Sequence, residues 1–167
     1  MINNSKNRNL TRRAIIKLLR QHQSNVEKYS RIRNDPTISE WKSDFMMRKV
    51  SGGIVAENYD RLPGQQSPGS SIEETLLLEK SNVLDHIHHI ELRIQVVRIL
   101  LLSLREEYVR LVELRYFNRL PVEKVCEALF CSRSTFYRRH DQVLEELTDE
   151  FNRLFTEEDR EILIGGN

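Results

Sequence analysis

Four side chains with hydrogen-bonding groups lie between positions 133 and 138: Arg133, Ser134, Tyr137 and Arg138. Residues three or four apart share one face of a helix. An arginine fork matches the paired O6 and N7 acceptors of guanine, Ser and Tyr hydroxyls bond bases or phosphates, and a tyrosine ring can also contact a thymine methyl group. These residue types at this spacing indicate contacts to base edges of double-stranded DNA.

Three neighbouring residues are placed to contact the phosphates of DNA instead of its bases. Arg139 lies at the flank of this face, and Ser132 and Thr135 lie where the N-terminus of a helix would offer N–H groups. Such groups bind phosphate oxygens, which set the register of a protein on DNA without carrying sequence information. We expect Ser132, Thr135 and Arg139 to contact phosphates.

Three predicted helices position these side chains. The apolar spacing and turn residues predict helices over residues 106–117, 121–129 and 133–155. Pro121 suits the first position of the second helix, and Ser132 is a favoured N-cap for the third. A short helix, a tight turn and a capped basic helix are typical of a helix-turn-helix domain.

The third of these helices has one apolar face. Its members recur at helical spacing: Phe136, His140, Val143, Leu144 and Leu147. We expect this face to pack on apolar residues of the preceding helix, namely Val122, Val125, Cys126 and Leu129. That packing would leave the arginines on the opposite face exposed.

A family resemblance supports this interpretation. The strings LREEYVRLVELRYF and PVEKVCEALFCSRSTFYRR, within residues 104–151, resemble region four of bacterial sigma factors, which recognises a promoter element. The layout of the chain is similar to that of the RinA/ArpU-like late-gene transcription regulators of phages of Gram-positive bacteria. The resemblance implies an activator of phage or mobile-element late genes whose DNA-contacting helix includes Arg133, Ser134, Thr135, Tyr137 and Arg138. His140 departs from the pattern, because an aliphatic residue is usual there.

Residues 1–50 form a basic helical region. Residues 1–33 contain nine Lys or Arg and one Glu, a net charge of +8, although the whole chain carries only +1. Apolar positions predict an amphipathic helix from Leu10 to about Ile32, a break at residues 34–36 and a short helix capped by Thr37. The first helix carries Arg12, Arg13, Lys17 and Arg20, which form either a second set of DNA phosphate contacts or an ordinary solvated surface.

The middle of the chain predicts a linker and a long helix. Residues 51–71 collect Gly, Pro and Ser, which is typical of a linker. Ser71 and Glu74 then form a capping-box pattern at the start of a helix within residues 72–104. Its apolar seam has heptad spacing: Val83, Ile87, Ile90, Ile94, Val97, Leu101 and Leu104. The seam needs a partner, and the N-terminal helix, a second copy in a homodimer, or both would serve.

No residue pattern indicates catalysis or a cofactor. The chain has neither a Gly-rich phosphate loop nor a nucleophile elbow, so we expect no enzymatic activity. His86 and His89 lack partners at metal-ligand spacing, and Cys126 and Cys131 lack a second pair. We therefore expect no metal site, and reduced cysteines.

Composition predicts an all-α fold, because Gly and Pro number only 6 and 4 while helix-forming residues dominate. We expect an N-terminal helical arm, a long central helix, a helix-turn-helix domain at residues 105–155 and an acidic tail at residues 156–167, where Thr156 caps a solvated helix. The chain shows no membrane span or secretory signal, which favours the cytoplasm of a bacterial host cell.

The expected function is sequence-specific, non-enzymatic DNA binding in transcription regulation, with RNA polymerase as a further partner. Two alternatives stay open. A DNA-packaging recognition subunit, similar to a small terminase, would use the same helices and assemble into a ring. A mimic of sigma region four would bind polymerase without binding DNA. The mass of the protein in solution separates a regulator from a packaging ring.

Overall fold

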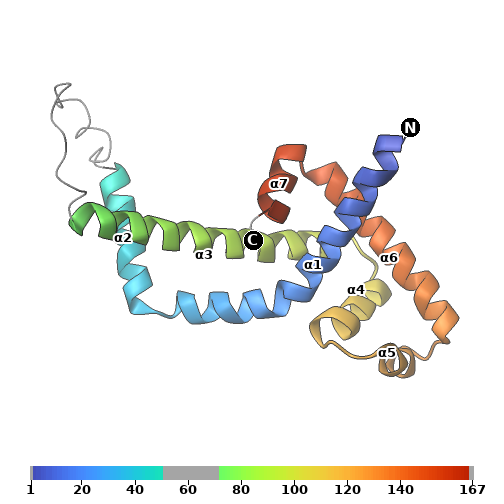
Figure 1. Cartoon of the computed structure of the whole chain (residues 1–167). Coiled ribbons are helices and arrows are strands. Elements are labelled where there is room, and N and C mark those ends of the chain that lie inside the picture. Colours follow the sequence, from blue (N-terminus) through green and yellow to red (C-terminus); the bar gives the residue numbers. More distant parts are fainter. Residues whose placement is uncertain (1, 51–71, 166–167) are drawn as a thin grey trace. The chain divides into compact units, whose positions relative to one another are not determined.

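The computed structural model describes residues 2–50 and 72–165, and every regular element in those ranges is a helix (Figure 1). The all-α class predicted from composition is confirmed. The predicted linker and its Ser71 cap lie outside the described residues, as do the side chains of residues 2–7, 44–50 and 72–77. In chain order the helices are α1 (Ile2–Arg33), α2 (Pro36–Val50), α3 (Ile72–Leu102), α4 (Glu106–Val112), the π-helical turn η1 (Glu113–Phe117), α5 (Val122–Ala128), α6 (Arg133–Leu154) and α7 (Glu157–Gly165).

The chain forms two compact units. Residues 1–26 and 91–167 make up the first, and residues 27–90 make up the second. In the second unit, the ammonium group of Lys80 lies 5.5 Å from the centroid of the Trp41 ring, so a cation–π contact links α3 to α2. All the residues predicted to contact DNA lie in the first unit.

The helix ends follow local signals. α3 and α6 begin and end close to the predicted residues, whereas α1 begins at Ile2 and is longer than predicted. The cap of α2 is Asp35 and not Thr37, because an Asp35 carboxylate oxygen accepts a hydrogen bond from the Thr37 N–H at 2.9 Å. Asp35 is the better N-cap here because Pro36 can then occupy the first helical position, where no N–H is needed.

The main core of the first unit draws on helices from both ends of the chain. Its buried members come from α1 (Ile15, Leu18, Leu19), α3 (Val96, Val97, Leu100), the following turn (Leu104), α4 and η1 (Tyr108, Val112, Tyr116), α6 (Val143, Leu147, Phe151) and α7 (Leu163). The apolar face of α1 is therefore part of the core. The C-terminal end of α3 belongs to the same cluster. The N-terminal helix α1 is therefore one of the partners that the sequence led us to expect for this long helix.

The buried face of α3 departs slightly from a strict heptad. Ile87, Ile90, Ile94, Val97 and Leu104 are buried as predicted. The prediction is wrong for Val83, which is 39% exposed, and Leu101 is only partly buried, whereas Leu100 outside the seam is fully buried. The C-terminal part of α3 is buried over a wider face than the seam, because Val96, Val97 and Leu100 all pack into the main core.

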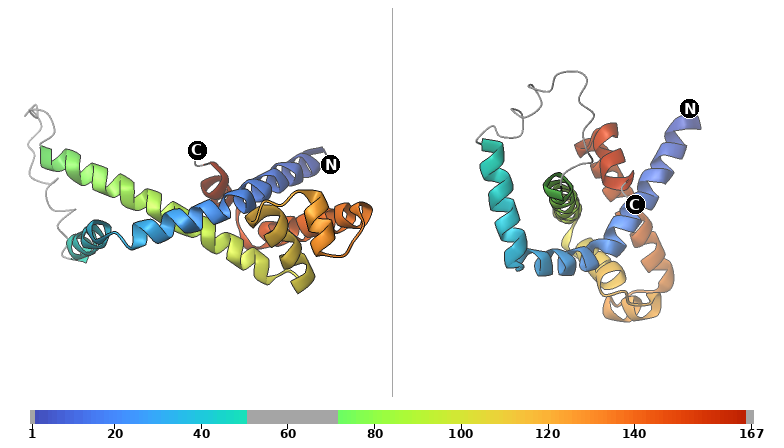
Figure 2. Two further views of the ribbon diagram at one scale, coloured as in Figure 1. Left: turned by 90° about the horizontal axis from the view of Figure 1, so that it is seen from below. Right: turned by 60° about the vertical axis from the view of Figure 1, so that its left-hand side comes forward.

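A smaller apolar cluster joins α4 and η1 to α5 and the first turns of α6, which lie close together in Figure 2. Its buried members are Leu111, Leu114, Val125, Cys126 and Phe136. The prediction that α6 packs on α5 is right for Phe136 but wrong for Val143 and Leu147, which belong to the main core. The reason is length: at 1.5 Å per residue α5 spans only about 10 Å, so it covers only the beginning of α6.

α7 is not simply a solvated tail. Thr156 caps it as predicted, since its hydroxyl accepts from the Asp159 N–H at 3.3 Å and the Asp159 carboxylate accepts from the Thr156 N–H at 3.0 Å. However, Leu163 is 7% exposed and packs into the main core. The prediction of a solvated helix is wrong for this face. Besides Leu163, the Arg160 guanidinium anchors α7 by donating to the Phe155 carbonyl at 2.9 and 3.0 Å.

Candidate functional site

The turn before α6 sets the direction of that helix. The Cys131 N–H donates to the Cys126 carbonyl at 3.0 Å and the Phe130 N–H to the Glu127 carbonyl at 3.3 Å. Phe130 has a positive φ of 49°, so these bonds form a Schellman motif with Phe where Gly is more usual. Pro121, predicted as the first residue of α5, instead precedes it as the N-cap.

The N-terminus of α6 is capped as the sequence predicts. The Ser132 hydroxyl accepts a hydrogen bond from the Thr135 N–H at 3.2 Å. It also lies 2.9 Å from the hydroxyl oxygens of Ser134 and Thr135. These contacts hold the first turn of α6 in one geometry.

One side of α6 carries the four residues predicted to contact bases, which we call the α6 polar face: Arg133, Ser134, Tyr137 and Arg138. All four are exposed. The Glu123 carboxylate on α5 accepts from the Arg133 guanidinium at 2.7 Å, whereas Arg138 has no ion-pair partner among the residues described. The sequence pattern did not indicate Glu123, although an acidic residue in the first turn of α5, ten positions before Arg133, is a usable signal.

The predicted phosphate contacts are partly engaged within the chain. Ser132 is the cap and is exposed, and Thr135 is half-buried beside it. Arg139 lies 3.7 Å from the Glu107 carboxylate, and its side chain is 33% exposed. An exposed ion pair of this length is weak, so Arg139 can exchange its partner for another anion at little cost.

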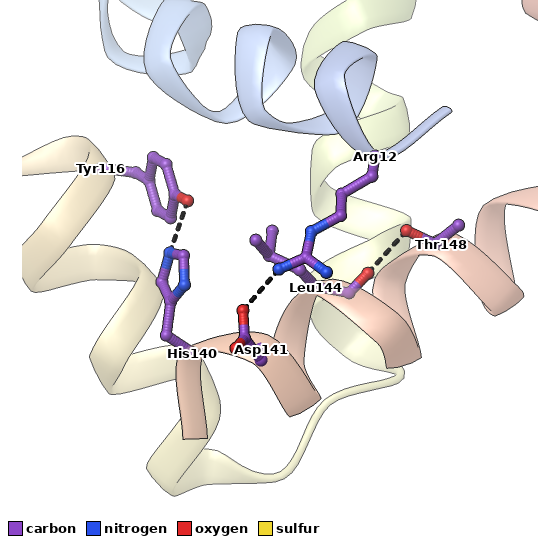
Figure 3. Close-up of polar contacts among 6 residues, drawn as sticks. All are labelled: Arg12, Tyr116, His140, Asp141, Leu144 and Thr148. Atoms are coloured by element: carbon purple, nitrogen blue, oxygen red, sulfur yellow. Dashed lines mark hydrogen bonds and ion pairs between the residues drawn. The ribbon is translucent and has the colours of Figure 1, made fainter. Parts of the chain in front are cut away.

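The basic helix α1 lies beside α6 and pairs with it. The Arg12 guanidinium donates to the Asp141 carboxylate at 2.5 Å (Figure 3), and Arg8 pairs with Asp149. The three remaining cations predicted as secondary contacts, Arg13, Lys17 and Arg20, are exposed. Arg12 therefore forms an ion pair with α6. The periodicity of either helix by itself could not predict this pair.

His140, the polar member of the otherwise apolar face of α6, has a polar partner. Its Nε2 lies 2.8 Å from the Tyr116 hydroxyl (Figure 3). Tyr116 belongs to η1, the π-helical turn that ends the predicted helix 106–117. In this turn the Asn118 N–H donates to the Glu113 carbonyl at 2.8 Å. The half-buried imidazole is thus hydrogen-bonded.

Burial lowers the pKa of His140, and the nearby Arg12 and Arg115 lower it further, against the opposing effect of Asp141. Burial also lowers the pKa of His22, helped by Arg98. The His22 ring packs on Phe117 with ring centroids 4.7 Å apart, and its Nδ1 has no hydrogen-bond partner among the described residues. Both histidines are neutral in the folded protein at neutral pH.

These two histidines predict a loss of stability in mild acid. Below about pH 6.5 the unfolded chain binds more protons on the two rings than the folded protein does, because the pKa values in the folded protein are lower. The free energy of unfolding should therefore fall as the pH drops from about 7.5 to about 5.5. Urea unfolding at several pH values measures this, and His140→Gln or His22→Gln should make the dependence shallower.

The exposed His88 provides a matched control for this experiment. His88→Gln should leave the pH dependence as it is in the wild type. An unchanged dependence in both His140→Gln and His22→Gln would show that these rings do not carry the effect.

The other residues considered as metal ligands do not form a metal site among the described residues. His86 and His89 are exposed, and the described ranges contain no group of three or more His, Cys, Asp or Glu placed to hold a metal ion. Cys126 is buried and Cys131 half-buried, both as free thiols. None of the described helices has the length and apolar character that a membrane crossing requires.

Comparison with known proteins gives no match to this chain, whether to protein-family models, to curated protein sequences or to solved structures.

Proposed function

We propose that this chain is a sequence-specific DNA-binding transcription regulator, in which α5 and α6 act as a helix-turn-helix and α6 enters the major groove. The observation that carries the proposal is the α6 polar face, which is exposed over the first turns of a capped helix. The major groove is about 12 Å wide and admits one α-helix, whose N-terminal residues reach the base edges. The resemblance noted in the sequence further suggests an activator of phage or mobile-element late genes in a bacterial cytoplasm, without enzymatic activity.

The two arginines of the α6 polar face differ in whether they form an ion pair within the chain. Arg138 has no ion-pair partner among the described residues, so its fork is available for guanine. Arg133 is held by Glu123 from α5. The pair is exposed, with side chains 66% and 52% accessible, and therefore contributes little to stability. Its role in this proposal is to orient the Arg133 fork before DNA arrives.

The basic surface of α1 extends the proposed interface. Arg13, Lys17 and Arg20 are exposed on a helix whose neighbour Arg12 pairs with Asp141 of α6. Phosphate contacts from these cations would add affinity without sequence preference and would make binding more sensitive to salt. Ser132, Thr135 and Arg139 would contact phosphates at the start of α6.

The decisive experiment compares Arg133→Ala and Arg138→Ala with the wild type on a duplex that the wild-type protein selects from a random library. Each lost guanine contact should cost about 1 to 3 kcal/mol and relax the preference at one base pair. This corresponds to a roughly 5- to 150-fold loss of affinity, measured by fluorescence anisotropy of labelled DNA. Arg13→Ala should instead weaken binding to all sequences alike and lower the salt dependence.

Arg153→Ala is the matched control, because Arg153 is an exposed arginine in the last turn of the same helix and pairs only locally with Glu150 at 2.6 Å. It should bind DNA as the wild type does. Equal affinity and equal sequence preference in the wild type, Arg133→Ala and Arg138→Ala would refute the proposal.

A homodimer through α3 and contact with RNA polymerase belong to the same proposal. Ile99 and Leu102 are exposed three residues apart and share one side of α3 near its C-terminal end, while Leu78 and Val83 are exposed elsewhere along the helix. A second copy packed there would give two α6 helices and hence a two-part binding site. Sedimentation equilibrium tests the assembly: a dimer agrees with regulation, and a closed ring of many copies would favour DNA packaging instead.

A further inference from the structure

A cavity of about 540 Å³ lies in the first unit beside the first turns of α6. Its wall is formed by residues of α1, η1 and the turn after it, α5 and α6. The volume falls within the range of roughly 300 to 1,000 Å³ that is usual for small-molecule sites. The cavity is half open, so a ligand can enter without unfolding the helices around it.

Three arginines and no carboxylate line this cavity: Arg20 from α1, Arg115 from η1 and Arg119 from the turn after it. Arg20 and Arg119 are exposed and make no ion pair with any described residue. The Nη1 of Arg115 donates to the Leu120 carbonyl at 2.9 Å, which orients its guanidinium. Three guanidinium groups around one space, without a counter-charge in its lining, favour an anion with several oxygens, such as a phosphate.

Aromatic rings form much of the rest of the wall. Tyr116 and His140 are joined by their 2.8 Å hydrogen bond (Figure 3). The ring of Phe136 stacks at 28° on that of His140 with centroids 5.6 Å apart, and meets that of Tyr137 edge-on at 5.4 Å. Tyr116 and Phe136 are almost fully buried and form the floor of the cavity, whereas Tyr137 is 55% exposed and can present its ring to a planar group.

We infer that this cavity binds a small phosphorylated molecule with a planar aromatic ring, of the chemical class of the purine nucleotides. The arginines hold the phosphate, and the exposed ring of Tyr137 contacts the base. Tyr137 belongs both to this cavity and to the α6 polar face. Under the proposed DNA-binding function, on which this last step rests, an occupied cavity therefore changes the affinity for DNA.

Calorimetric titration of the full chain with GDP and ADP, without DNA, tests the site directly. Both nucleotides should bind, while guanosine and adenosine should bind at least about tenfold more weakly, because charged hydrogen bonds to the phosphates are lost. Arg20→Ala and Arg119→Gly should each weaken nucleotide binding about tenfold. Glycine is chosen at position 119 because Arg119 has a positive φ of 54°, which glycine adopts without strain.

Arg13→Ala is the matched control, since Arg13 is exposed on α1 but does not line the cavity. It should bind GDP as the wild type does. Arg133→Ala and Arg138→Ala should also keep full nucleotide affinity even where they lose DNA, which separates a failure of this site from a failure of the proposed function.

Absence of GDP and ADP binding at millimolar concentration would overturn the inference. In that case, Arg20 keeps only the phosphate contact proposed for α1, and a loss of DNA affinity in Arg119→Gly would add Arg119 to the same contacts. Nucleotide binding that is unaffected by either variant would also overturn it, because the ligand would then lie elsewhere.

Discussion

Phe136→Ala is expected to lower the free energy of unfolding by about 3 to 5 kcal/mol, the usual cost of removing a buried aromatic ring. Phe136 is 1% exposed and lies in the smaller cluster with Leu111, Leu114, Val125 and Cys126. It is the buried α6 residue that joins the first turns of this helix to α5 and α4. Alanine would leave a void that these short helices cannot close without losing contacts elsewhere. Urea unfolding followed by far-ultraviolet circular dichroism measures the change.

Phe130→Ala provides the matched control for this prediction. Phe130 is the same residue type, six positions earlier, and is 97% exposed. Its ring contributes almost no buried area, so its removal should change the free energy of unfolding by less than about 0.5 kcal/mol. Equal effects in the two variants would mean that α6 does not pack on α5 through Phe136.

The second large effect is expected at Leu19, where alanine should cost about 2 to 5 kcal/mol of unfolding free energy. Leu19 is fully buried and belongs to the main core together with residues of α3, α4, α6 and α7. Truncation of its side chain therefore removes contacts that hold α1 against helices from the opposite end of the chain. The midpoint of urea unfolding should fall, with little change in the slope of the transition.

Leu10→Ala is the control, since Leu10 lies on the same helix but is 57% exposed. Nine residues separate the two leucines, which places them on opposite sides of α1. A small effect of Leu19→Ala, comparable to that of Leu10→Ala, would show that α1 is an independent arm and not part of the core.

These two cores explain how the fold positions the candidate site. The smaller cluster holds the first turns of α6, and the main core holds its C-terminal part together with α1. The Arg12–Asp141 pair and the hydrogen bond from the Tyr108 hydroxyl to Gln142 at 3.1 Å link α6 to its neighbours between the two clusters. The α6 polar face is thus supported from behind along its whole length.

Much of the local structure follows from the sequence alone. The predicted extent of α3 agrees with the structure, and Ser132 caps α6 as its residue type and position indicate. The exposed α6 polar face also follows from helical spacing. These features depend on residues a few positions apart, because helix periodicity, capping bonds and turn geometry are local.

Only the tertiary structure decided which surfaces meet. Periodicity shows that a face is apolar but not what covers it, so the division of α6 between two clusters and the docking of Leu163 were not foreseen. The pairs Arg12–Asp141 and Glu123–Arg133 join residues on different helices, as does the bond between Tyr116 and His140. The three arginines of the cavity come from separate segments of the chain as well. Such contacts depend on how whole helices pack, since a side chain reaches only the few neighbours that the packing brings within contact distance.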